Sequence, residues 1–179
     1  MAVRDKHVTD DTERRVLVLY ALQQLGGAGQ MQLIVLMDES KAMNYFDLHI
    51  ALSSLHESGL IVPEPMLADT LWHLTAAGEE TLKLYAERAA LSLREAIDQA
   101  AAAFREPFRR ERQLATLVSH EGGLAYHAQM ELNEQGHSLM KLDLSVPTAA
   151  MAKRLCDRWP KQAGRLYELI VRALGEDEA

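Results

Sequence analysis

The chain has 179 residues, of which 48% are hydrophobic and 25% charged, and its formal net charge is −7. A chain of this length forms one domain or two small ones, and no apolar run is long enough to span a membrane. Its one cysteine, Cys156, excludes an intrachain disulfide. Because the N-terminal residues also lack the apolar stretch of a secretory signal, we expect a cytoplasmic protein.

Two helices are predicted at the start of the chain. The first begins after Asp10, where Asp10 and Glu13 have the spacing of a capping box, and it ends at Gly26. A short second helix is predicted over residues 30–37. The glycine-rich segment between them lacks the Lys-Ser/Thr pair of a phosphate-binding loop, so we predict a simple turn there.

The third helix has the clearest start signal in the chain. Asn44 is the predicted N-cap and Asp47 its partner, while Met43 and Leu48 occupy the positions of a hydrophobic staple. Gly59 is predicted to end the helix. The apolar stripe expected to face the core consists of Tyr45, Leu48, Leu52 and Leu55.

Two short strands follow, at residues 60–64 and 70–74. Pro63 and Pro65 suit a loop or a sheet edge, because proline cannot donate to a central ladder. Thr75 is the predicted N-cap of a fourth helix. The residues expected on the inner side of that helix are Leu82 and Tyr85.

A long helix is predicted over residues 92–104 and is expected to end or kink at Pro107, which lacks the N–H that a helix needs. Its apolar stripe would be poorly buried in either small domain alone. We therefore expect it to contribute to a symmetric homodimer. The stripe consists of Leu93, Ile97, Ala100 and Phe104.

The second half of the chain changes to a two-residue hydrophobic period, which is typical of strands with one buried face. The predicted strands are residues 114–119, 124–132 and 141–146. A hairpin turn is predicted at residues 133–136. A helix capped by Thr148 and closed at Trp159-Pro160 comes next, then a last helix over residues 161–174 and a frayed acidic tail at 176–178.

These elements predict an α+β fold: an N-terminal winged helix-turn-helix followed by a C-terminal three-stranded antiparallel sheet with two helices. The expected winged-helix domain spans residues 1–90 and the linker helix residues 91–112. An α+β domain for dimerisation or ligand sensing is expected over residues 113–179.

Five stretches of the sequence are distinctive: NYF at 44–46, LHESGLI at 55–61, LWHLTAAG at 71–78, LMKLDLSVPT at 139–148 and LCDRW at 155–159. In these stretches the chain resembles the bacterial family named domain of unknown function 4364, over about residues 13–174. The first half of that family is similar to PadR-like regulators, which implies a winged helix. The resemblance implies no assigned function and no catalytic residue.

In a helix-turn-helix motif the second helix enters the major groove, and its exposed side chains meet the base edges. Here that is the third predicted helix, which has no arginine. On its exposed face, His49 and Ser53 are candidate DNA contacts, and Lys41 is a candidate just before the helix. The same face carries Phe46 and Ile50. In the alternative interpretation these two side chains pack on the second helix and do not contact DNA.

Charge is unevenly distributed along the chain. Residues 1–90 carry 7 basic and 13 acidic side chains, whereas residues 91–179 carry 12 and 13. The predicted wing contains Glu64 and Asp69, where a phosphate-binding wing would carry cations. The predicted DNA-binding half is therefore the more acidic one, which is unusual for a nucleic-acid binder.

The basic cluster of the chain consists of Arg105, Arg109, Arg110 and Arg112. Arg109 and Arg110 are candidate contacts to DNA phosphates, or to an acidic partner. The alternative is a solvated helix end, because glutamates are interleaved with the arginines.

The sequence carries no motif for catalysis, a cofactor or a metal. Its seven histidines are scattered, and none has the spacing of a metal site. We therefore expect a transcription regulator that binds double-stranded DNA as a homodimer, and not an enzyme. The alternative is a protein-interaction module on a winged-helix scaffold, whose acidic first half binds a basic partner. The sequence does not identify an effector.

Overall fold

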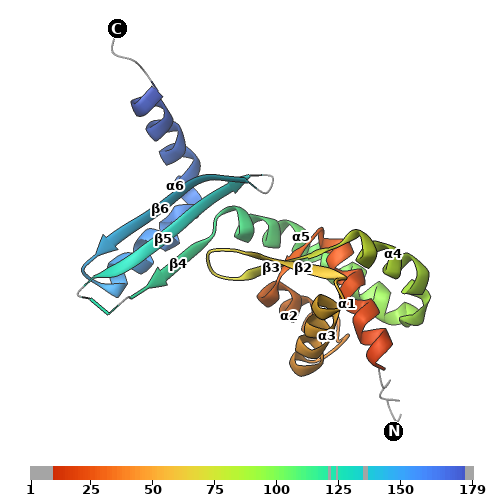
Figure 1. Cartoon of the computed structure of the whole chain (residues 1–179). Helices are drawn as coiled ribbons and strands as arrows, with labels where there is room; N and C mark the ends of the chain where they lie inside the picture. The colour runs from red at the N-terminus through yellow and green to blue at the C-terminus, as the bar shows by residue number, and fades with distance from the viewer. Residues whose placement is uncertain (1–9, 121, 124, 135–136, 176–179) are drawn as a thin grey trace. The chain divides into compact units, whose positions relative to one another are not determined.

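The computed structural model describes residues 10–175 apart from 121, 124, 135 and 136. The chain forms two compact units, Met1–Phe108 and Arg109–Ala179 (Figure 1), and each is described by itself. Leu124 of the second predicted strand, part of the predicted 133–136 turn and the acidic tail lie outside the described residues. No helix in the described part of the chain is long and apolar enough to cross a membrane.

Three helices form the centre of the first unit: α1 (Asp11–Leu25), α2 (Gln30–Glu39) and α3 (Tyr45–Glu57). The predicted caps of α1 and α3 are confirmed, with Asp10 accepting a hydrogen bond from the Glu13 N–H at 2.7 Å. Helix α1 is buried on most sides. The buried residues of its central turns include Leu17, Val18, Leu19, Ala21 and Leu22.

A small antiparallel sheet completes the wing-like part of this unit. It contains β1 (Ala28–Gly29), β2 (Ile61–Pro65) and β3 (Thr70–Leu74), in the order β1-β3-β2. Both prolines of β2 therefore lie in an edge strand, as their lack of an N–H requires. Strand β1 was not predicted, because two residues are too short to show any hydrophobic period.

Helix α4 (Ala76–Tyr85) follows, and Thr75 is its N-cap as predicted. Leu82 is buried, but the expectation that Tyr85 faces the core is wrong, since 47% of that residue is exposed. A 3-10 turn, Ala86–Arg88, then leads to the next helix.

Helix α5 (Leu91–Gln113) is longer than predicted and continues through Pro107. Ile97, Ala100 and Phe108 are buried in the core of the first unit, and the stacked rings of Phe104 and Phe108 lie 5.1 Å apart. This packing compensates for the hydrogen bond that proline removes. The expectation that the apolar stripe of this helix is poorly buried is therefore wrong. The homodimer was expected because of that poor burial, so this helix no longer supports it.

The second unit consists of a sheet and one helix. Strands β4 (Thr116–Ser119), β5 (Tyr126–Glu134) and β6 (His137–Val146) pair antiparallel in that order, and α6 (Ala149–Gly175) packs against the sheet (Figure 1). The two predicted C-terminal helices are thus a single helix, which continues through Pro160. The indole N–H of Trp159 donates to the Glu131 carbonyl at 3.0 Å, and the ring is 2% exposed.

The two faces of this sheet differ as the alternating pattern predicted. Ala128 and Met130 of β5 are buried with the first half of α6. The alternate residues of β5 carry polar side chains that pair with β6. His127 and Gln129 both bind the carboxylate of Asp143, at 2.9 and 3.1 Å, and Glu131 binds Lys141 at 2.8 Å.

Candidate nucleic-acid interface

The candidate interface is built on α3, the second helix of the helix-turn-helix. The Asn44 side chain accepts a hydrogen bond from the Asp47 N–H at 3.0 Å and donates one to the Asp47 carboxylate at 2.9 Å. Arg14 of α1 lies 3.6 Å from the same carboxylate. Lys41, in the turn before α3, has a φ of 54°, the one positive value for a non-glycine residue in the described ranges. These interactions fix the start of α3 against α1.

Helix α3 has one face buried in the core and one largely exposed face. Leu48, Leu52 and Leu55 are buried in the core as predicted, but the expectation that Tyr45 joins them is wrong, because Tyr45 is 52% exposed. Its ring packs against that of His49 instead, with the centroids 4.3 Å apart. The outer face of the helix is therefore free for a partner.

The structure brings three of the five candidate residues together in the first unit. His49 is half-buried and shares a 3.3 Å hydrogen bond with Gln30 of α2, and Ser53 donates to Glu57 at 3.1 Å. Lys41 is exposed and lies 3.4 Å from Asp38. Gln30, which no sequence signal singled out, thus belongs to the same surface.

Apolar side chains also lie on this face of α3, where Phe46 and Ile50 are exposed as predicted and not covered by α2 as in the alternative interpretation. Phe46 is 75% exposed and Ile50 is 59% exposed. The rings of Tyr45 and Phe46 are in contact, with their centroids 5.6 Å apart. We call this set of exposed side chains on α3 the apolar patch: Tyr45, Phe46 and Ile50. Contiguous apolar side chains on a surface mark interaction sites more often than single exposed ones do.

The acidic residues of the wing have structural partners. Glu64 of β2 lies 2.9 Å from His73 of β3 across the hairpin. The Asp69 carboxylate accepts hydrogen bonds from the N–H groups of Met31 and Thr70, at 3.2 and 2.7 Å, and so caps the start of α2. A Cβ on Gly29 would displace this carboxylate from the position in which it caps the helix. Sequence spacing cannot reveal this cap, because Met31 and Asp69 lie 38 positions apart.

The four arginines of the basic cluster differ in their contacts and in their exposure. Arg105 donates two hydrogen bonds to the Gln24 carbonyl, at 2.8 and 3.1 Å, where its charge offsets the C-terminal end of the α1 dipole. Burial lowers the pKa of Arg112. Arg109 and Arg110 are exposed at the end of α5 and belong to the second unit.

No group of three or more His, Cys, Asp or Glu side chains that could hold a metal ion occurs within the described ranges. Cys156 is buried against the sheet, with its sulfur 3.9 Å from the Leu117 carbonyl, and burial raises the pKa of its thiol.

The fold and this surface define an α+β protein whose N-terminal helix-turn-helix carries a wing-like sheet and is followed by a separate sheet-and-helix unit. The chain belongs to the family described as Domain of unknown function (DUF4364), whose model matches residues 14–174, and the resemblance of its motifs to that family is thereby confirmed. Comparison with curated proteins and with solved structures gives no match.

Proposed function

We propose that the chain is a DNA-binding transcription regulator that inserts α3 into the major groove of double-stranded DNA. The observation that supports this most strongly is the exposed outer face of α3, on a helix whose inner face is buried in the core of its unit and whose start is capped by the Asn44 side chain. A rigid helix that exposes one whole face next to a β-hairpin is the arrangement that reads DNA in winged-helix proteins. The proposal assigns no catalytic role and places the protein with the chromosome, in the cytoplasm.

The chemistry of this face favours A·T base pairs. Phe46 and Ile50 offer apolar surface, and the thymine methyl is the apolar group of the major groove. His49 and Ser53 supply hydrogen bonds beside them. No arginine is present on α3 to bind guanine. We expect an A·T-rich operator read mainly by methyl contacts.

Phosphate binding must come from a few positioned cations. Lys41 at the start of α3 and Arg109 and Arg110 of α5 are the proposed contacts. The remaining surface of the first half is acidic and offers no diffuse attraction to DNA. Affinity is therefore expected to be modest at physiological salt.

A protein partner is the second candidate, and the apolar patch favours it. DNA interfaces are more polar and more basic than this surface, whereas apolar and aromatic side chains are enriched at protein interfaces. In that case the helix-turn-helix is a scaffold, and Phe46 and Ile50 are the central contacts.

Fluorescence anisotropy with pools of A·T-rich and G·C-rich duplexes, at two salt concentrations, separates the two candidates. The regulator proposal predicts tighter binding to the A·T-rich pool, lost in Phe46→Ser, and an affinity that falls with salt. Glu80→Gln, at an exposed position on α4, is the control. Absence of binding to either pool at low salt would reject the proposal and leave the protein partner.

A further inference from the structure

The second half of α6 carries an apolar surface that no described residue of its own unit buries. Up to Ala163 the helix packs on the sheet through Ala152, Cys156, Trp159 and Ala163. From residue 164 to Gly175, the last described residue, no position is buried. Five large apolar side chains in that segment are at least 36% exposed: Leu166, Leu169, Ile170, Val171 and Leu174.

These side chains continue the stripe that packs on the sheet. The buried residues of the first half follow one another at intervals of three or four, and Leu166, Ile170 and Leu174 extend the same series on the same helix face. A stripe that keeps its period beyond the edge of the sheet is expected to pack on another element there. In the second unit the structure describes the sheet, α6 and the end of α5 from Arg109 to Gln113.

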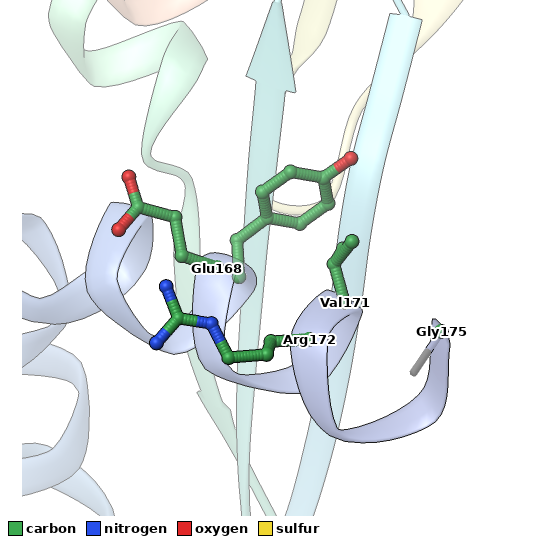
Figure 2. Close-up of a pocket in the computed structure, with 5 residues that line it drawn as sticks. Glu168, Val171, Arg172 and Gly175 are labelled. Carbon is green, nitrogen blue, oxygen red and sulfur yellow. The ribbon is translucent and has the colours of Figure 1, made fainter. Parts of the chain in front are cut away.

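The charged residues of this segment lie on the other side of the helix. By the same spacing, Arg165, Glu168 and Arg172 fall opposite the stripe. Glu168 and Arg172 line a hollow of about 430 Å³ with Tyr167, Val171 and Gly175 (Figure 2). All of these residues belong to α6. Packing along the stripe would therefore bury no charge.

We propose that this stripe is the interface between two copies of the chain, with the two α6 segments antiparallel and crossing at Ile170. Such a crossing sets Leu166 of each copy opposite Leu174 of the other, Tyr167 opposite Ala173, and Ile170 opposite itself. Every pair is apolar, and the large tyrosine meets a small alanine. A two-fold interface requires this kind of self-complementary surface.

The available area fits a second copy. From the exposed fractions, the five apolar side chains offer on the order of 500 Å² per copy, so a pair reaches the roughly 1,000 Å² that a specific interface needs. The inference rests on the proposed function in one respect: a dimer would supply two α3 helices for two half-sites. Its test uses no DNA, so the dimer proposal and the DNA-binding proposal can be rejected independently.

Sedimentation velocity on the whole protein at tens of micromolar (about the concentration where a micromolar dimer is populated) is the first test. The wild type is expected to be a dimer, and Ile170→Glu a monomer. Leu84→Glu is the matched control, since Leu84 is a 78% exposed leucine on α4, and it should remain a dimer. An unchanged near-ultraviolet signal from Trp159 would show that the variants are folded. A monomeric wild type, or a dimeric Ile170→Glu, would overturn the proposal.

Cross-linking tests the register. In a Cys156→Ala background, Ile170→Cys places two thiols at the crossing point and should form an interchain disulfide under mild oxidation. Glu168→Cys places them on the far side of each helix and should stay reduced. Equal cross-linking at both positions, or none at residue 170 in a protein that sediments as a dimer, would exclude the antiparallel crossing.

Discussion

The carboxylate of Glu13 in α1 accepts a hydrogen bond from the backbone N–H of Ala90, at 2.8 Å, immediately before α5 begins. Glu13 is 6% exposed, so this contact lies within the first unit. Because the N–H groups at a helix start have no partner in the helix, a buried carboxylate there both satisfies a donor and offsets the dipole. One residue of α1 thus fixes where α5 starts.

We therefore expect Glu13→Ala to lower the free energy of unfolding by about 1–2 kcal/mol, the usual cost of losing a capping interaction to a charged group. Glu13→Gln retains an acceptor oxygen and should lose less. Urea denaturation followed by circular dichroism measures both. Glu95→Ala, at an exposed site on α5, should change stability by less than about 0.5 kcal/mol. Equal losses at the two sites would contradict the capping role.

Two glycines should respond in opposite directions to the same substitution. Gly78 of α4 lies against the Leu60 carbonyl, and a Cβ there would collide with that backbone oxygen. Gly78→Ala is expected to cost about 1–3 kcal/mol through the forced backbone shift. Gly164 of α6 has open space around it, so Gly164→Ala should stabilise by about 0.5–1 kcal/mol through helix propensity. Thermal unfolding of both variants distinguishes them, and a shift of the same sign in both would refute the argument.

Asp143 should make the second unit sensitive to acid. Its pKa is lowered, chiefly by hydrogen bonds from His127 and Gln129. A lowered folded-state pKa stabilises the protein above the unfolded-state value of about 4, and this contribution is lost as the pH falls through the folded value. The difference in free energy of unfolding between wild type and Asp143→Asn should have its largest value at pH 6 and become smaller below about pH 4. A difference that stays constant down to pH 2 would contradict this.

If the regulator proposal holds, the two classes of candidate DNA contact should differ in effect. The double substitution Arg109→Ala and Arg110→Ala should weaken binding to all duplexes alike and reduce the salt dependence by about one unit per lost phosphate contact. His49→Ala should change the preference among sequences, because in this proposal the His49 side chain, hydrogen-bonded to Gln30, contacts base edges. Salt titrations on two unrelated duplexes measure both effects. If His49→Ala lowers the affinity for both duplexes equally, His49 does not contact the bases.

Local signals were sufficient for much of the fold. The caps at Asp10, Asn44 and Thr75 appear where the sequence predicts them, because each depends on residues a few positions apart. The three period-2 strands of the second half also form, but β6 begins at His137 and not at residue 141, and Asn133 and Glu134 of the predicted turn belong to β5. The caps at Ala90 and at the start of α2 come from residues far along the chain, Glu13 and Asp69, and no local pattern contains them.

The two prolines show where local rules give the wrong answer. Pro107 was expected to end or kink its helix and Pro160 to end one, because proline lacks an N–H and restricts the residue before it. In each case a large buried ring lies next to the proline, Phe108 in the first core and Trp159 in the second. The burial of these rings offsets the local cost. On α3 the sequence placed Phe46 and Ile50 on the exposed face, where they lie, but it placed Tyr45 on the buried face, because the helical period alone does not fix the edge of the face that the core covers.

The two tryptophans of the chain, Trp72 in β3 and Trp159 in α6, provide one intrinsic fluorophore for each unit. A Trp72→Phe variant emits only from the sheet-and-helix unit, and a Trp159→Phe variant only from the helix-turn-helix unit. The emission maximum of each can therefore be followed separately during denaturation. Coincident transitions would show that the units unfold as one cooperative block, and separate transitions would give the stability of each in the intact chain.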